Sequence, residues 1–213
     1  MNNIAKYIDH TNLNQDAVDS DITRLCEEAR KFGFASVCIN PVHVQLAVSI
    51  LKNEKTKICS VIGFPLGADP FEMKFAETRF LIHQGLEEVD MVMNIGALKQ
   101  GKYNLIEKEI RKVVDASEGN CVKVIIEACL LNDDEKFLAA RIARDSGADY
   151  IKTSTGFSFS GATIEDVVLL KKFVGDEIGV KASGGIKTKE AAISFIEAGA
   201  NRIGTSSGVD IIS

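Results

Sequence analysis

The sequence predicts a single closed (β/α)8 barrel, a TIM barrel in the α/β class, spanning residues 1–213 as one domain. A local pattern recurs along the chain, in which an amphipathic run ends in a glycine and an apolar, β-branched segment begins a few residues later. The glycines are Gly33, Gly85, Gly147 and Gly199. This pattern is typical of a helix that ends in a left-handed glycine cap and is followed by a parallel strand. Its repetition over a chain of this length favours one α/β barrel.

Eight segments rich in apolar and β-branched residues are the expected strands. They fall at about 5–9, 36–40, 57–63, 88–94, 122–128, 149–154, 179–183 and 202–206. Val122–Glu127 is largely apolar, as a parallel strand covered on both faces should be. An open doubly wound sheet is the alternative, but no Gly-x-Gly-x-x-Gly motif follows an early strand to favour it.

Helices are expected between these strands, and several have recognisable start signals. They fall at about 15–32, 42–52, 71–84, 103–117, 133–146, 163–174 and 188–198. Asn132 and Glu135 have the spacing of a capping box, and Thr163 and Thr188 are candidate N-caps. Because the sequence stops soon after the eighth strand, we expect the last helix to be very short or missing.

Composition and charge argue against several classes of protein. The formal net charge is −5 and no basic run stands out, which argues against a nucleic-acid partner. The 5 cysteines form no C-x-x-C pair and the 3 histidines share no ligand spacing, so we expect neither disulfides nor a metal site. The stretch from Met1 to Asp9 lacks the apolar core of a signal peptide, and no apolar run approaches membrane-spanning length. We therefore expect a cytoplasmic protein without a membrane partner.

The segment 150–157 begins as a buried strand and ends in small hydroxylated residues and Gly156. Strand alternation puts Lys152 and Ser154 on the same face. An ammonium group at the end of a core strand is costly unless it is paired or its pKa falls. A lysine that spends time neutral is a candidate Schiff-base nucleophile, although a lysine at a strand end can also simply extend into solvent.

Two further ionisable residues are expected at the same end of the barrel. Strand 179–183 directs Lys181 toward the barrel axis, and the alternation in strand 88–94 directs Asp90 and Asn94 inward. Two neighbouring ammonium groups depress each other's pKa, and a carboxylate can accept and return protons. Imine catalysis requires these properties, whereas the alternative is a buried ion-pair cluster that only fills the barrel.

The loops after the seventh and eighth expected strands are candidate phosphate sites. Glycine lets backbone N–H groups approach an anion closely, and serine hydroxyls add donors. Barrel enzymes commonly hold a phosphate at these two loops, although a glycine pair alone is more often only a turn. The candidate residues are Gly184, Gly185, Gly204, Ser206 and Ser207.

Motifs along essentially the whole chain resemble those of the deoxyribose-phosphate aldolase family. They lie at 8–11, 61–65, 88–94, 123–127, 150–156, 180–186 and 204–207. The resemblance implies a class I aldolase that reversibly cleaves 2-deoxy-D-ribose 5-phosphate, a sugar phosphate, into D-glyceraldehyde 3-phosphate and acetaldehyde. It further implies that Lys152 forms the Schiff base, that Asp90 donates and accepts protons, and that Lys181 tunes the amine and the proton relay.

The same resemblance implies the remaining features of the site and its partners. The matching phosphate-binding positions are Gly184, Gly185, Ser206 and Ser207. No metal or organic cofactor is implied, because a protonated imine acts as the electrophile. Members of the family often self-associate, so a homo-oligomer is expected. The short C-terminal end departs from members that have a longer tail.

Four residues have weaker assignments. Asp9 and Thr11, just after the first expected strand, are placed to contact substrate or water, or to cap a turn. Glu127 is expected to join the charge cluster or to hold a lysine in place. Cys38 is expected to line the pocket or to act as a small buried hydrophobe.

Three other functions remain open from the sequence. Another Schiff-base barrel, such as a transaldolase or a keto-acid aldolase, would share the lysine but use a different donor. A metal-free sugar-phosphate isomerase would use the phosphate loops without a covalent adduct. A non-catalytic phosphosugar-binding barrel would bind ligand without turnover.

Overall fold

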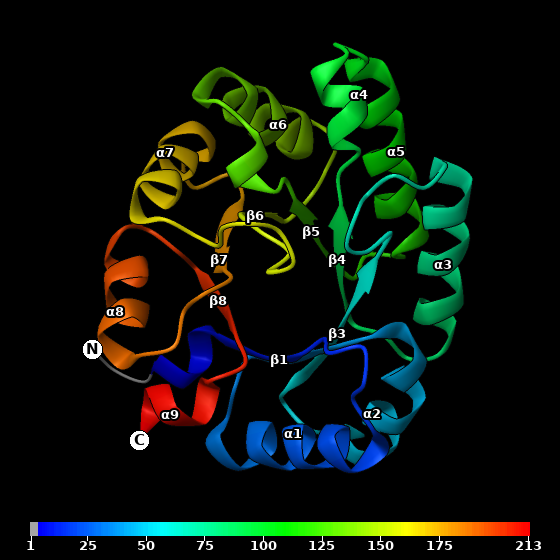
Figure 1. Cartoon of the computed structure of the whole chain (residues 1–213). Coiled ribbons are helices and arrows are strands. Elements are labelled where there is room, and N and C mark those ends of the chain that lie inside the picture. The colour runs from blue at the N-terminus through cyan, green and yellow to red at the C-terminus, as the bar shows by residue number, and fades with distance from the viewer. Residues whose placement is uncertain (1–3) are drawn as a thin grey trace.

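Eight parallel strands close into a barrel in the order of the sequence, as predicted (Figure 1). The computed structural model describes residues 4–213, so residues 1–3 of the expected N-terminal segment lie outside the described part of the chain. Strand β1 pairs with both β2 and β8, and the second pairing closes the barrel. The strands are β1 (Ile8–Asn12), β2 (Ser36–Ile39), β3 (Lys57–Ile62), β4 (Glu88–Val92), β5 (Cys121–Ile125), β6 (Tyr150–Lys152), β7 (Gly179–Ser183) and β8 (Arg202–Thr205).

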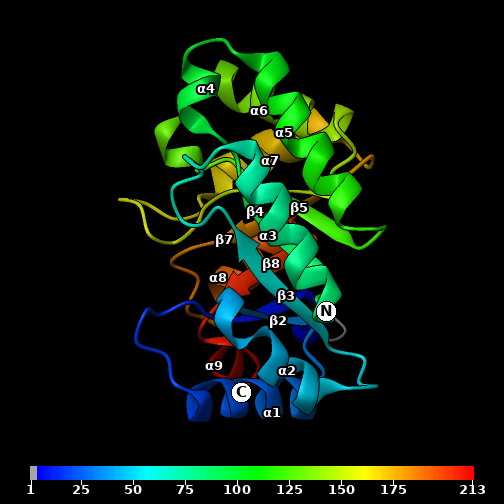
Figure 2. The ribbon, with the colours of Figure 1, turned by 90° about the vertical axis from the view of Figure 1, so that its right-hand side faces the viewer.

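The helices surround the barrel, and the loops before and after the strands project on opposite sides of it (Figure 2). The longer helices are α1 (Asp19–Phe32), α2 (Val44–Leu51), α3 (Phe71–His83), α5 (Tyr103–Ala116), α6 (Asp133–Asp145), α7 (Ile164–Val174) and α8 (Lys189–Glu197). The short elements are α4 (Ile95–Lys99), α9 (Gly208–Ile212) and the 3-10 segments η1 (Ile4–Tyr7), η2 (Pro41–His43) and η3 (Ala128–Leu130). The last helix, α9, is short, as expected. Within residues 4–213, no helix has both the length and the apolar character that crossing a membrane requires.

The first strand lies later in the chain than the sequence suggested. The strand expected at about 5–9 is found at Ile8–Asn12, because Ile4–Tyr7 forms a 3-10 turn. Asp9 and Thr11 are therefore strand residues and do not lie in a loop after it. The second residue of this strand is Asp9, which faces the charged part of the barrel interior. The apolar pattern therefore did not reveal the strand.

The end of β4 also differs from the expectation for residues 88–94. The strand stops at Val92, and Asn94 starts α4, where its side chain accepts a hydrogen bond from Ala97 N at 2.9 Å. Asn94 thus caps a helix instead of facing into the barrel. Asparagine is among the preferred N-cap residues, which gives the physical reason for the difference.

Two apolar clusters of unequal size lie within the described part of the chain. The larger cluster lies between the barrel and the helices and includes outward-facing strand residues such as Val89, Met91 and Ile151. A smaller cluster near β2 and β3 consists of Leu13, Cys38, Cys59 and Val61, with Phe64 packed against it. The barrel interior beside β4, β6 and β7 is instead occupied by ionisable side chains. This difference locates the candidate site.

Start signals in the sequence correctly predicted three helix N-termini. Asn132 Oδ1 accepts a hydrogen bond from Glu135 N at 2.9 Å, and Glu135 Oε2 accepts one from Asn132 N at 2.8 Å. Thr163 and Thr188 cap α7 and α8 through their side chains. Each cap satisfies backbone N–H groups that have no partner within the helix.

The capping box at α6 generates a stability prediction. Asn132→Ala removes the acceptor for Glu135 N, so the free energy of unfolding should fall by about 1 kcal/mol. Asn132→Asp keeps an acceptor at the same place and should retain most of the stability. Urea denaturation of the two variants measures the difference. Equal losses in both would contradict the capping role.

Candidate active site

Lys152 is the last residue of β6 and has a side chain that is only 3% exposed. It is placed beside Lys181 of β7 by the strand register. Its Nζ lies 2.8 Å from Asp90 Oδ2 on β4. The two lysines and the aspartate that the sequence singled out therefore meet inside the barrel, with Lys152 at the C-terminal end of β6 and Asp90 and Lys181 in the middle of β4 and β7.

Asp90 is fully buried and accepts hydrogen bonds from three lysines. Its Oδ2 accepts from Lys152 at 2.8 Å and from Lys181 at 2.7 Å, and its Oδ1 accepts from Lys123 at 2.9 Å. Burial alone would raise the pKa of Asp90, but the ammonium groups of Lys123, Lys152 and Lys181 outweigh it and hold this pKa well below the ordinary range. These contacts favour the carboxylate form of Asp90.

Lys181 lies between two carboxylates, which the sequence did not suggest. Its Nζ is 2.7 Å from Asp90 Oδ2 and 2.6 Å from Asp9 Oδ2. The contact with Asp9 has the distance of an ion pair but not the angles of a hydrogen bond. Burial lowers the pKa of Lys181, and the carboxylates of Asp9 and Asp90 more than offset this, so it lies above the ordinary value. The sequence predicted a lowered pKa for the two lysines, whereas the two carboxylates make the net shift of the Lys181 pKa upward.

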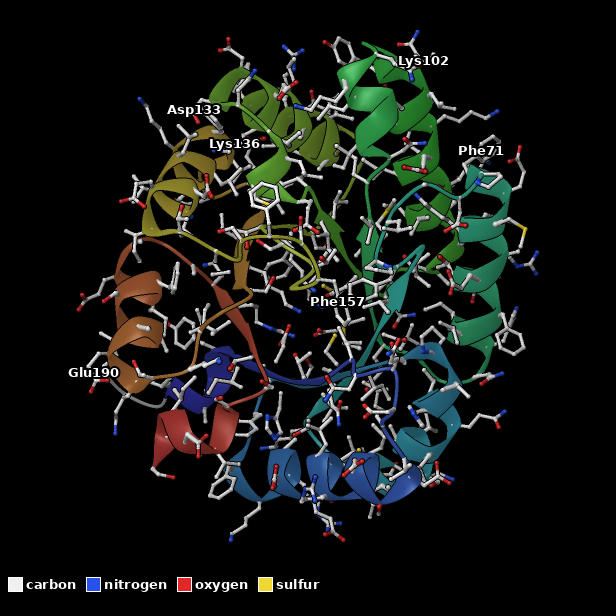
Figure 3. The ribbon with its side chains drawn as sticks, in the orientation of Figure 1. Phe71, Lys102, Asp133, Lys136, Phe157 and Glu190 are labelled. Carbon is white, nitrogen blue, oxygen red and sulfur yellow. The ribbon has the colours of Figure 1, made fainter. Side chains whose placement is uncertain are left out.

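A cavity of about 730 Å³ opens above these side chains at the C-terminal ends of the strands. Lys152 lines it, whereas the fully buried Asp90 and Lys181 lie behind the lining. Phe157, in the loop after β6, also lines the cavity and lies near the middle of the barrel in the view along its axis (Figure 3). Every substrate-binding residue predicted from the sequence lines this cavity: Thr11, Gly156, Gly184, Gly185, Gly204, Ser206 and Ser207.

Close backbone packing joins the loops that follow β6 and β7. A Cβ atom added to Gly161 would lie 2.1 Å from the carbonyl oxygen of Gly184, so a side chain at this position cannot be accommodated. Gly184 itself has a φ of 89°, which favours glycine. Ser183 Oγ also donates to the Ser154 carbonyl oxygen at 2.6 Å. The candidate phosphate loop is thereby held against the loop that follows Lys152.

Comparison with known proteins agrees with this geometry. A sequence model described as the DeoC/LacD family aldolase matches residues 3–213. This chain belongs to the DeoC/LacD family of aldolases. The deoxyribose-phosphate aldolase of Geobacillus sp. (strain WCH70) is 58% identical over 212 residues, which are 99% of this chain and 95% of that protein. The deoxyribose-phosphate aldolase of Thermococcus gammatolerans is 55% identical over 213 residues, covering 98% of this chain and 95% of the relative.

Solved aldolase structures share the whole barrel. The structure of QR15, an aldolase, superposes with a TM-score of 0.95 at 43% identity, covering 99% of this chain and 95% of the other. The deoxyribose-phosphate aldolase of Aeropyrum pernix, described as a unique tetrameric structure, gives a TM-score of 0.92 at 35% identity and covers 98% and 89% of the two chains. The fold of this aldolase is thus that of the family.

The weaker candidates occupy different places in the aldolase. Asp9 is fully buried in the charged cluster, where Arg202 Nε donates to its Oδ1 at 2.7 Å. Thr11 lines the cavity, and its hydroxyl donates to the Asp9 carbonyl oxygen at 2.8 Å. Glu127 does not join the cluster or hold a lysine. Its carboxylate accepts hydrogen bonds from the backbone N–H and the hydroxyl of Thr155 instead.

Cys38, the remaining weak candidate, is fully buried and does not line the cavity. It lies opposite Cys59 on β3, and a hydrogen bond between the two side chains lowers the pKa of the Cys38 thiol. Ligand atoms of Cys38, Cys59 and Asp90 lie within 4.8 Å of one another. Because Asp90 is already bound by three ammonium groups, a metal cation there would face strong repulsion.

Sequence reasoning missed three charged residues that adjoin the site: Glu88, Lys123 and Arg202. Lys123 Nζ donates to Glu88 Oε2 at 2.6 Å and to Asp90 Oδ1 at 2.9 Å. Arg202 Nη2 donates to Glu88 Oε2 at 2.5 Å. The sequence did contain an indication of these residues. Glu88 lies two residues before Asp90 and so faces the same side of its strand, and Lys123 interrupts an otherwise apolar strand. Each strand judged by itself does not reveal that these charges face one another.

The charged cluster predicts how stability depends on pH. Asp9 and Asp90 have pKa values below the ordinary 3.8, so their stabilising contribution is present above that pH and is lost as the pH falls below it. Lys123 and Lys181 have pKa values above the ordinary 10.5, so their contribution is present below that pH and is lost as the pH rises through the folded-state values. Thermal unfolding should therefore occur at lower temperature at about pH 3 than at about pH 6, and at lower temperature at about pH 11 than at about pH 9.

An Asp9→Asn variant serves as the control for the acidic side of this profile. It removes one carboxylate that must be protonated on acidification, so its unfolding temperature should fall less steeply below about pH 4. A wild-type protein with the same unfolding temperature at about pH 3 and about pH 6 would contradict the paired carboxylates.

Proposed function

We propose that this aldolase is a class I enzyme that reversibly cleaves 2-deoxy-D-ribose 5-phosphate to D-glyceraldehyde 3-phosphate and acetaldehyde through an imine on Lys152. The observation that carries the proposal is the position of Lys152. Among the described residues it is the buried lysine that lines the cavity, and its Nζ contacts a carboxylate shared with Lys181. The names of the relatives at 58% and 55% identity support the choice of substrate.

In the cleavage direction, the free amine of Lys152 attacks the C1 aldehyde of the open-chain sugar, and loss of water gives a protonated imine. The imine acts as the electron sink. Removal of the proton from the C3 hydroxyl then breaks the C2–C3 bond and releases glyceraldehyde 3-phosphate. The enamine that remains on Lys152 is protonated at C2, and hydrolysis of the resulting imine releases acetaldehyde. No metal or organic cofactor takes part in this scheme.

Asp90 and Lys181 are the proposed proton-transfer residues. Both amines contact the same oxygen, Oδ2 of Asp90, at 2.8 Å for Lys152 and 2.7 Å for Lys181. A proton can therefore pass between the two amines along one carboxylate, directly or through a water molecule. Lys181 is kept cationic by Asp9 and Asp90, which suits it to donate a proton to the departing hydroxyl during imine formation.

The phosphate of the substrate is proposed to bind at the loops that follow β7 and β8. The carbon chain then extends from these loops across the cavity to Lys152. Support comes from the shared lining, because the glycines and serines of both loops and Lys152 border the same cavity. Glycine-rich backbone and hydroxyl groups offer the donors that a phosphate requires.

The enzyme is further proposed to act in the cytoplasm as a homo-oligomer, without a nucleic-acid partner. The net charge of −5 disfavours nucleic-acid binding, and the five cysteines are free in this structure. The Aeropyrum pernix relative is described as tetrameric, which supports self-association.

Borohydride trapping tests the imine directly. Reduction in the presence of acetaldehyde should leave a stable two-carbon adduct on Lys152, identified by peptide mass mapping. Lys152→Met should lose the adduct and lower turnover by at least about a thousandfold, because the covalent intermediate can no longer form. Lys187→Met removes an exposed lysine that lines the same cavity and should keep the adduct on Lys152. Near-native turnover in Lys152→Met would overturn the proposed function.

A second test separates phosphate binding from imine chemistry. Ser207→Glu places a carboxylate at the proposed phosphate loop, so the KM for 2-deoxy-D-ribose 5-phosphate should rise by about tenfold or more through charge repulsion. Imine formation with acetaldehyde, which carries no phosphate, should continue at a similar rate. Equal impairment of both reactions would place the phosphate elsewhere or indicate a damaged site. Ser207→Ala is the control for loss of the hydroxyl without added charge.

A further inference from the structure

Seven charged side chains from six strands form one connected network inside the barrel. Six of them make a closed ring in which acids and bases alternate. Around the ring the order is Asp90, Lys181, Asp9, Arg202, Glu88 and Lys123, and Lys123 returns to Asp90. The ion-pair distances in the ring run from 2.5 Å, between Arg202 and Glu88, to 2.9 Å, between Lys123 and Asp90. Lys152 is attached to this ring through Asp90 alone.

The network extends from the cavity toward the opposite end of the barrel. Lys152 lines the cavity, whereas Glu88 and Arg202 are the first residues of β4 and β8 and lie at the N-terminal ends of their strands. The side chains of Asp9, Asp90, Lys123 and Lys181 have no exposure to solvent, and those of Glu88 and Arg202 are 6% and 13% exposed. Water therefore screens the interactions within the ring poorly.

The ring is electrically balanced by itself, and Lys152 upsets the balance. Three carboxylates face three cations in the ring, so an ammonium on Lys152 leaves one positive charge unmatched in the barrel interior. An unmatched buried charge is costly, and loss of a proton relieves it.

The contacts distinguish Lys152 from the other bases of the network. Lys123 touches Glu88 and Asp90, and Lys181 touches Asp9 and Asp90, whereas Lys152 touches only Asp90. Arginine does not deprotonate in proteins, which removes Arg202 from consideration. Burial lowers the pKa values of Lys123 and Lys181, but their carboxylate partners more than offset it and leave both above the ordinary value. Lys152 is thus the lysine of the network that has a single carboxylate contact.

We propose that Glu88, Lys123 and Arg202 are positioning residues for imine formation, because they complete the charge ring behind Asp90 that makes Lys152 the base to release its proton. They do not touch the cavity and act on substrate only through Asp90, Asp9 and Lys181. The inference rests on the proposed function, since it concerns the amine that forms the imine. The other titratable groups near the ring include three thiols and a phenol. Cys38 and Cys59 approach Asp90, Cys121 lies beside Glu88 and interacts with Lys123, and Tyr150 lies beside Arg202.

A purely structural ion network makes a different prediction from a ring that sets protonation. Removing either partner of a structural pair weakens folding, whichever sign of charge is lost. Removing charges of opposite sign from the proposed ring changes the protonation of Lys152 in opposite directions. The pH dependence of imine formation is therefore the informative measurement.

The experiment records borohydride-trapped adduct on Lys152 with acetaldehyde, together with kcat/KM for 2-deoxy-D-ribose 5-phosphate, as a function of pH. Arg202→Gln removes a positive charge, so the three carboxylates of the ring then balance three ammonium groups, including that of Lys152. The acidic limb of the pH profile should therefore move up by about one pH unit, which is equivalent to about tenfold less free amine at a given pH on that limb. Glu88→Gln removes a negative charge and should move the limb down by about one unit. The double variant should return it to near the wild-type position.

Two further variants keep the test decisive. Arg202→Lys preserves the charge and should preserve the position of the acidic limb, although it changes the shape of the side chain. Lys123→Gln also removes a positive charge and should move the acidic limb in the same direction as Arg202→Gln. If Glu88→Gln does not fold, these two variants still test the inference. Circular dichroism establishes which variants are folded.

The outcomes separate this inference from the proposed function. A wild-type protein without a Lys152 adduct would overturn the proposed function. A wild-type adduct together with folded charge-deletion variants whose limbs stay in place, or all move in one direction, would overturn the role of the ring while leaving the imine chemistry intact.

Discussion

The Asp90 carboxylate is the interaction on which the rest of the site depends. Three lysines on three different strands contact its two oxygens at distances between 2.7 and 2.9 Å. Without this shared anion, three ammonium groups would lie close together in a medium that screens them poorly. Asp90 lies on β4, next to β5 and across the barrel from β7, so its one carboxylate can contact all three lysines.

Barrel closure is what brings these partners together. Lys152 and Asp90 are 62 residues apart in the chain, and Lys181 and Asp90 are 91 residues apart. Parallel strands of a closed barrel direct alternate side chains to the axis, and their C-terminal ends all open on the same side. An interior that is apolar near β2 and β3 and charged elsewhere is a costly arrangement for stability alone. This cost is consistent with a chemical use of the charged half.

Much of the fold and part of the site could be predicted from local patterns. Strand and helix alternation predicted the barrel, and cap residues such as Asn132 and Thr163 predicted helix starts. Alternation within single strands correctly directed Lys152, Lys181 and Asp90 inward, and glycine-rich loops predicted residues that line the cavity. The same method failed for Asn94, because a helix cap and an inward-facing strand residue look alike in a short polar segment.

The sequence by itself determined the fold class, the family and which residues lie at the mouth of the barrel, because these follow from periodicity, turn chemistry and local motifs. The tertiary structure alone decided the partners of each charge. Lys181 is held between Asp9 and Asp90, Glu127 is directed to Thr155, and the ring is completed by Arg202 and Lys123. The physical reason is that the protonation state of a buried group depends on every charge within a few ångströms. Those charges come from strands that are distant in the chain.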